Sequence, residues 1–204
     1  MTKLRFAMIF MAIGAFTAGS SGQFASAQDG HSHDKESMEK TEKKISEALS
    51  KLSTEDQKLV ASQRFCPIMT YDRLGAMGAP LKVMIEGKPV FLCCKDCTKD
   101  AMADGAKTLK TTQKLREVSE VLAKLPMEER MAIESQKYCA VAEGNFLGSM
   151  GAPIKLDLNG KSVYLCCGGC TKKAQANPAA MVAKVEKLKQ AGLAKNHDHS
   201  DHKH

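Results

Sequence analysis

The chain contains two copies of one cysteine-bearing unit, and this duplication limits its fold more than any other feature. Every cysteine of the first copy recurs 73 residues later in the second. The surroundings repeat at the same offset, since Leu-Gly-x-Met-Gly-x-Pro begins at Leu74 and again at Leu147. Such self-similarity predicts two equivalent structural units. The eight cysteines, all inside the two copies, are Cys66, Cys93, Cys94, Cys97, Cys139, Cys166, Cys167 and Cys170.

Residues 1–27 have the pattern of an export signal. Lys3 and Arg5 precede an apolar run from Phe6 to Ala18, and the segment ends in Ala25-Ser26-Ala27, the small-x-small pattern that a signal peptidase cuts. The apolar run is shorter than the roughly 20 residues that a membrane-spanning helix needs, and no later segment qualifies. We therefore expect an exported protein, periplasmic or secreted, without a stable membrane anchor.

The positive charge of the chain does not indicate a nucleic-acid partner. The formal net charge is +7, but the lysines are interleaved with acidic residues, as in the segment 39–44. This mixture is typical of a solvated helical surface. The sequence has no Trp and three Tyr, so it lacks the aromatic platform on which bases stack. We expect no nucleic-acid binding.

Apolar residues at helical spacing precede the first cysteine of each copy. In the first copy this stripe is Ile45, Ala48, Leu49 and Leu52. Ser53, with Asp56 three residues later, predicts a second helix that runs to about Arg64. In the second copy the stripe is Val118, Val121, Leu122 and Leu125. Pro126 then opens a helix through Gln136, because proline suits the start of a helix. A pair of helices leads into each first cysteine.

A period of two replaces the helical period after a glycine-rich connection. Apolar and polar residues alternate over 81–86 and 154–159. Asn159-Gly160 is a turn dipeptide that tolerates positive φ at both positions, and Glu86-Gly87 is its counterpart. Each unit therefore contains a β-hairpin, with returning strands at 90–92 and 163–165 that end at the adjacent cysteines. A helical pattern resumes after the last thiol, which favours thiolate near a helix N-terminus.

These elements predict an α+β fold with two small repeats, residues 45–117 and 118–192. A His-containing polar tail with a helix start, 28–44, precedes them, and a His-rich tail, 193–204, follows. In each repeat three thiols far apart in sequence are expected to converge around the hairpin. A unit of this size with few aromatic residues has a small core and commonly needs a metal or disulfides to stay folded.

The cysteine segments resemble the TRASH/YHS-type heavy-metal-binding domains. The resemblance covers about 64–109 and 137–182, and it is carried by the leading cysteine and by a Cys-x3-Cys pair at the end of a hairpin. It implies a small treble-clef-like zinc-finger fold in each repeat, with Cys66, Cys93 and Cys97 as ligands in the first and their counterparts in the second. It also implies a role in metal sensing, trafficking or resistance, with a metal efflux or trafficking protein as a partner. The ligands that the resemblance implies in the second repeat are Cys139, Cys166 and Cys170.

The donor type indicates which metals fit. Thiolate sulfur suits Cu(I) and Zn(II), as well as toxic soft ions, and does not suit Mg, Ca or Mn. Structural zinc normally takes four ligands, so Cys94 and Cys167 are the candidates to complete each site. Met69, a soft donor, follows Cys66, whereas Ala142 occupies that place in the second copy. The predicted function is a non-enzymatic protein that sequesters, buffers or delivers copper or zinc.

Two other interpretations of the cysteines remain open. An exported protein with an even number of cysteines is often stapled by disulfides, and such a module would bind another envelope protein. The Cys-x-x-Cys segments at 94–97 and 167–170 also occur in thiol–disulfide oxidoreductases, although there they normally lie in a βαβ context rather than after a hairpin.

The six histidines lie outside both repeats, near the two ends of the chain. His31 and His33 stand in the N-terminal tail, and the others alternate with polar residues from His197 to His204. Short His-rich tracts bind divalent metals loosely. We expect these tails to be flexible by composition and to collect metal ions for the sulfur sites.

Overall fold

The computed structural model describes residues 30–198, with side chains from 39 to 193. The predicted export signal and the last six residues lie outside this range. The elements confirm an α+β fold, and the paired elements of the two repeats are offset by 73 residues. Helix α2 (Thr54–Gln63) corresponds to α5 (Met127–Gln136), and the hairpins correspond strand for strand. In the first repeat the hairpin is β1 (Leu81–Ile85) and β2 (Lys88–Leu92), and in the second it is β3 (Ile154–Leu158) and β4 (Lys161–Leu165).

The two hairpins have the turns that their sequences predict. Strands β1 and β2 pair antiparallel with Ile85 opposite Lys88, and β3 and β4 pair in the same register. The turn residues have positive φ in both hairpins, 49° and 72° at Glu86 and Gly87, and 55° and 74° at Asn159 and Gly160. Positive φ at both central positions defines the two-residue turn whose twist matches that of the flanking strands. The returning strands consequently end just before the cysteine pairs.

The helices before each cysteine differ in detail from their predicted boundaries. Helix α1 (Gly30–Leu49) begins earlier than expected, so the backbone of His31 and His33 is helical rather than an irregular tail. The helix ends before Leu52, whose N–H bonds the Leu49 carbonyl at 3.0 Å. The predicted cap of α2 is confirmed, because the Ser53 hydroxyl accepts a hydrogen bond from the Asp56 N–H at 3.1 Å. Pro126 is the residue immediately before α5.

Helix α4 (Gly105–Leu122) belongs to both repeats. It closes the first repeat by packing against α2, as α7 (Pro178–Asp198) closes the second by packing against α5. It also supplies the first helix of the second repeat. A Cβ atom on Gly148 would lie 3.3 Å from Val118 of α4, and one on Gly75 would lie 3.1 Å from Ile45 of α1. The expected boundary between 117 and 118 therefore falls within a continuous helix.

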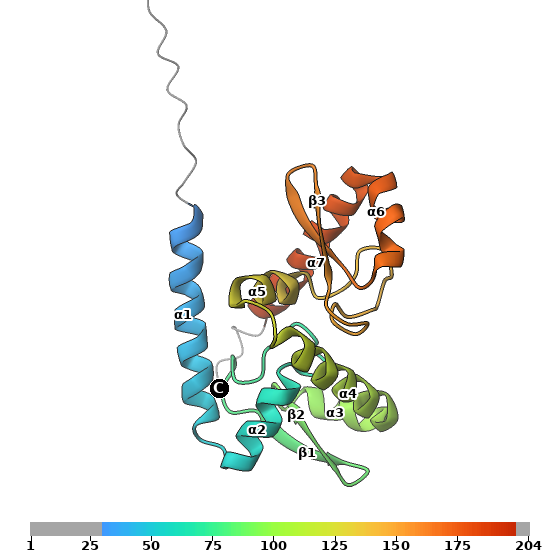
Figure 1. Ribbon diagram of the computed structural model, residues 1–204. Coiled ribbons are helices and arrows are strands. Elements are labelled where there is room, and N and C mark those ends of the chain that lie inside the picture. The colour runs from blue at the N-terminus through green and yellow to red at the C-terminus, as the bar shows by residue number, and fades with distance from the viewer. Residues whose placement is uncertain (1–29, 199–204) are drawn as a thin grey trace, which may run out of the picture.

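A short helix follows each cysteine pair and links the hairpin to the closing helix. In the first repeat it is α3 (Cys97–Ala103). In the second repeat a 3₁₀ turn, η1 (Gly168–Cys170), leads into α6 (Thr171–Ala176). Figure 1 shows the first repeat around β1, β2 and α4, and the second around β3, α6 and α7, with α1 as a long helix at the side.

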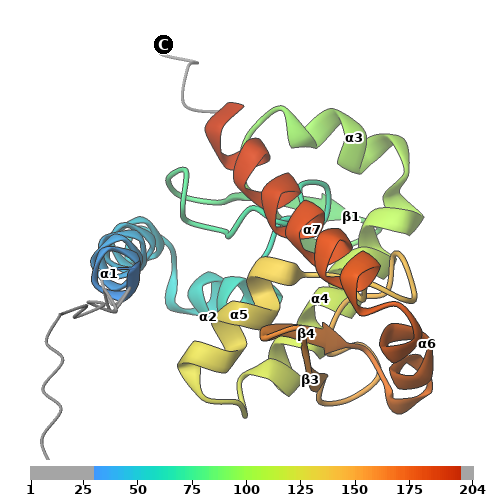
Figure 2. The same ribbon diagram turned by 90° about the horizontal axis from the view of Figure 1, so that it is seen from above.

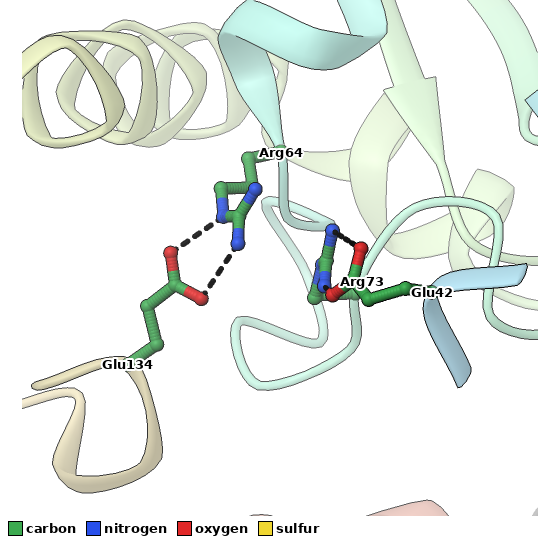
Figure 3. Close-up of polar contacts among 4 residues, drawn as sticks. All are labelled: Glu42, Arg64, Arg73 and Glu134. Carbon is green, nitrogen blue, oxygen red and sulfur yellow. Dashed lines mark hydrogen bonds and ion pairs between the residues drawn. The ribbon is translucent and has the colours of Figure 1, made fainter. Parts of the chain in front are cut away.

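Contacts between the repeats surround the loops that carry the leading cysteines. The guanidinium of Arg64 forms a two-pronged ion pair with Glu134 of α5, with one N–O distance of 2.9 Å (Figure 3). The hydroxyls of Thr70 and Tyr138 are 2.6 Å apart. The C-terminal part of α7 crosses the first repeat (Figure 2), and a Cβ on Gly192 would lie 2.7 Å from the ring of Tyr71. The repeats therefore pack against each other directly.

Candidate metal centres

The leading cysteine of each repeat lies in a tight turn that follows the second helix. The turn begins at Arg64, which ends α2 with φ at 63°, and an isolated bridge pairs Phe65 with Arg73. Within this loop the Cys66 N–H donates to the Asp72 carbonyl at 3.0 Å. Cys139 repeats the arrangement by donating to the Asn145 carbonyl at 3.0 Å. The loop thus turns each leading thiol inward, and both are buried.

A buried glutamine joins this loop to the strand that carries the next cysteine. The side chain of Gln63 accepts from the Phe91 N–H at 3.1 Å and donates to the Phe91 carbonyl at 2.6 Å. It also donates to the Phe65 carbonyl at 3.1 Å. Gln136 makes the same three bonds to Tyr164 and Tyr138. Sequence analysis missed this clamp, although the glutamine recurs at the 73-residue offset and could have been noticed there.

In the first repeat the thiols of Cys66, Cys93 and Cys97 converge as predicted. Their sulfur atoms all lie within 4.8 Å of one another, and all three side chains are buried. The Sγ–Sγ distance is 3.8 Å between Cys66 and Cys97 and 3.6 Å between Cys93 and Cys97. Residues 31 positions apart in the sequence therefore share one site.

The second repeat has the same trio in Cys139, Cys166 and Cys170. These sulfur atoms also lie within 4.8 Å of one another. The Cys170 sulfur is 3.8 Å from those of both Cys139 and Cys166. All eight cysteines lie within the described residues and all are free thiols. The two trios are therefore equivalent in geometry.

The sulfur spacing matches the edge of a metal coordination shell. A zinc–thiolate bond is about 2.3 Å long, so two sulfurs at corners of a tetrahedron lie about 3.8 Å apart. The Sγ–Sγ distances of 3.6 to 3.8 Å from Cys97 and Cys170 to the other members of their trios agree with this value. A disulfide bond would need about 2.05 Å. Small side-chain movements are sufficient for each trio to bind one ion.

The remaining two cysteines lie beside the trios and are half-buried. The Cys94 sulfur is 3.7 Å from that of Cys97 and 3.9 Å from that of Cys93. The Cys167 sulfur is 4.0 Å from that of Cys170. Both are thus within reach of their sites as a fourth sulfur donor, and both are more accessible than the three buried thiols.

The leading thiol of each trio is the first to ionise. Hydrogen bonds from Cys93 and Cys97 hold the pKa of Cys66 well below its usual value, and the same contacts raise the pKa of Cys93 and Cys97. Burial opposes ionisation of Cys139, but backbone N–H groups, with Ala142 first, outweigh it and lower its pKa. Burial raises the pKa of the other two thiols, and that of Cys170 reaches about 11. Two thiols of each trio therefore keep their protons at neutral pH.

The surroundings of the two trios differ in charge. Asp72 is buried, and its Oδ2 lies 3.8 Å from the Cys93 sulfur. The residue at this place in the second repeat is Asn145, which carries no charge. A carboxylate therefore lies beside the first trio, and an uncharged amide stands at the same position in the second repeat. Met69 packs against the first core, whereas Met77 and Met150 are exposed.

The fold and the site together define a duplicated α+β protein with one buried three-thiol cluster in each repeat. No family model, curated protein or solved structure matches the chain. Within the described residues, no helix combines the length and apolar character required to cross a membrane. The side chains of the histidines lie outside the described part of the chain, so the predicted collecting role of the tails stays a prediction.

Proposed function

We propose that the protein binds one soft metal ion in each repeat and that it sequesters, buffers or delivers copper or zinc outside the cytoplasm. The observation that supports this most strongly is the convergence of three buried thiols, twice, at the spacing of a metal coordination shell. Thiolate donors select soft or borderline ions, and all three members of each buried trio are cysteines. The resemblance to TRASH/YHS-type domains supports the same function.

The choice between the two metals depends on the fourth donor. Zinc prefers four ligands, so zinc binding would recruit Cys94 and Cys167, which lie 3.7 Å and 4.0 Å from the last thiol of their trios. Cu(I) is satisfied by three thiolates and would leave these cysteines accessible. An accessible thiol beside a copper site would suit transfer of the ion to a trafficking or efflux protein.

Native mass spectrometry of protein purified anaerobically provides the test. We expect two bound ions per chain, one in Cys66→Ser, one in Cys139→Ser and none in the double variant, so that each repeat is the control for the other. Chelation should release the ions and leave free thiols. A wild-type protein that binds no ion would overturn the proposal, and a loss of two mass units per cysteine pair would favour the disulfide-stapled module.

A second candidate, thiol–disulfide exchange, is favoured by one observation. Backbone N–H groups, first that of Gly169, lower the pKa of Cys167, which is also accessible and belongs to a Cys-x-x-Cys segment. An accessible thiol with a lowered pKa is the attacking group in such exchange. Disulfide reduction by the metal-free protein, lost in Cys167→Ser, would support this candidate; equal rates in wild type and variant would exclude it.

A further inference from the structure

In the second repeat, a side chain from the first repeat fills the groove between the first two helices, α4 and α5. The ring of Phe65, from the first repeat, is buried in the second core together with Val118, Leu122 and Ile133. The Lys137 Nζ lies 2.8 Å from the centre of this ring. Only about 10 Å³ remains open beside the ring. An aromatic side chain thus fills the groove between α4 and α5.

The first repeat has the same groove without an occupant from the described residues. It lies between α1 and α2 and has a volume of about 590 Å³. Each second-repeat residue that lines the filled groove falls 73 positions after a residue that lines the open one. For example, Val118, Leu122 and Ile133 correspond to Ile45, Leu49 and Val60. The open groove is therefore the counterpart of a surface that already binds an aromatic ring in this protein.

The rim of the open groove differs from its counterpart in charge. Ala61 stands where the filled groove has Glu134, the carboxylate that pairs with Arg64. Arg73 stands where the filled groove has Phe146. The charged residues around the open groove are Lys58, Arg64 and Arg73, with Glu42 as the single carboxylate. Figure 3 shows Arg64 and Arg73 near each other, paired with Glu134 and Glu42. Because Arg64 and Arg73 are each paired with a glutamate, Lys58 supplies the excess positive charge of the rim. A ligand for this groove should therefore carry negative charge.

A second copy of the chain does not offer a suitable aromatic residue among side chains 39–193. Phe65, Phe91, Phe146 and Tyr164 are buried. Tyr71 and Tyr138 are half-buried and contact each other, with ring centres 5.8 Å apart. The groove is also continuous with the joint between the repeats, because Arg64 lines the groove and pairs across the joint. The remaining four phenylalanines of the sequence all fall within residues 1–27, the predicted export signal. For a mature chain without that signal, the occupant that fits is a different protein.

We propose that the groove between α1 and α2 binds a segment of a partner protein in which an aromatic side chain is flanked by carboxylates. The ring occupies the place that corresponds to that of Phe65 in the second repeat, against the accessible side chains of Leu49 and Ala61 and above the buried Ile45 and Val60. The flanking carboxylates contact the basic rim. This inference is independent of metal binding, since none of the groove residues is a cysteine.

Titration of the full chain, in the metal state in which it is purified, with a blocked tripeptide tests the proposal. The probe has phenylalanine between two glutamates, and the binding is followed by amide chemical shifts in nitrogen–proton NMR spectra. We expect saturable shifts centred on Ile45, Leu49 and Ala61. Control peptides with alanine in the centre, or with lysines in place of the glutamates, should bind at least about tenfold more weakly.

Two matched variants complete the test. Ala61 is exposed, so Ala61→Glu and Ala61→Lys place opposite charges on the rim without disturbing the core. The glutamate variant should bind the acidic peptide at least about tenfold more weakly, and the lysine variant should bind it no more weakly than wild type. Ser50→Glu, on the opposite rim, is the second variant if the first fails to fold.

Three outcomes would overturn the proposal. They are the absence of saturable shifts, shifts centred away from the groove, and equal binding to Ala61→Glu and wild type. A dimer of the wild-type chain that is lost in Ala61→Glu would also overturn it, because the occupant would then be a second copy.

Discussion

Gln63 holds Phe91 by both polar groups of its backbone, with bonds of 3.1 Å and 2.6 Å across 28 positions of sequence. This contact connects the loop that carries Cys66 to the strand that ends just before Cys93. The contact is repeated between Gln136 and Tyr164, so the loop and strand of each three-thiol cluster are joined by one amide side chain of that repeat.

Replacing Gln63 by leucine should weaken the first metal centre selectively. The variant removes the hydrogen-bond partner of the Phe91 N–H and of the Phe91 and Phe65 carbonyls, and each buried group left without a partner costs about 1–3 kcal/mol. We expect a lower melting temperature and a lower metal affinity at the first site, with the second site unchanged. Gln136→Leu is the matched control and should do the reverse. Equal loss at both sites in either variant would contradict a local clamp.

Metal binding should release about two protons per site at neutral pH, because thiols must deprotonate to ligate. The leading cysteine has a lowered pKa in each trio, whereas the other two have raised values. The metal affinity therefore rises as the pH rises toward those raised pKa values. Calorimetry in buffers of different ionisation enthalpy measures the released protons. A release close to zero would mean that the trios are already fully ionised.

The two sites should differ in their preference for divalent over monovalent ions. The Asp72 carboxylate, 3.8 Å from the Cys93 sulfur, attracts Zn(II) more strongly than Cu(I), because the Coulomb energy scales with the charge of the ion. Asp72→Asn should lower the zinc-to-copper affinity ratio of the first site by about tenfold. Asn145→Asp should raise that ratio at the second site. Competition titrations with a chelator of known affinity measure the zinc-to-copper affinity ratio of each site. Unchanged ratios in both variants would refute a role of Asp72 in metal preference.

The ion pair of Arg64 and Glu134 should contribute more to stability than that of Arg73 and Glu42 (Figure 3). The Glu134 side chain is 9% exposed, whereas that of Glu42 is 46% exposed. Breaking a mostly buried pair leaves a desolvated charge, so Glu134→Gln should lower the free energy of unfolding by about 1–3 kcal/mol. Glu42→Gln should change it by less than about 1 kcal/mol. Denaturant unfolding compares the two, and a larger effect at Glu42 would contradict this ranking.

Lys137 should make the protein more stable as the pH rises from neutral toward 10. Burial holds the pKa of this lysine well below its ordinary value, so the folded state prefers the neutral amine. Between that lowered pKa and the unfolded value of about 10.4 the unfolded chain binds more protons, and stability rises with pH in this window. Lys137→Met should be more stable than wild type at pH 7, by about 1–3 kcal/mol.

The diagnostic measurement is the difference between wild type and Lys137→Met across that pH range, with the metal state held constant. The difference should shrink as the pH rises. A constant difference would show that the titration of Lys137 does not affect folding.

Much of the local structure could be predicted because it depends on residues close in sequence. The turn at Asn159-Gly160, the cap at Ser53 and the strands before the cysteine pairs all follow from backbone preferences and short-range alternation. The helix limits were less accurate, since α1 begins at Gly30 and ends before Leu52. An apolar stripe indicates the buried face of a helix, but it does not mark where neighbouring residues stop packing against it.

The sequence by itself determined the duplication, the α+β elements and the three thiols that each repeat brings to one site. A fixed offset and a local periodicity can both be read from the order of the residues alone. Only the tertiary structure decided that α4 serves both repeats, that Phe65 fills the groove of the second repeat while no described residue fills the first, and that Asp72 lies beside Cys93. These relationships join residues through space, and each depends on which surfaces exclude water together. Periodicity identifies a buried face, and packing selects the surface that covers it.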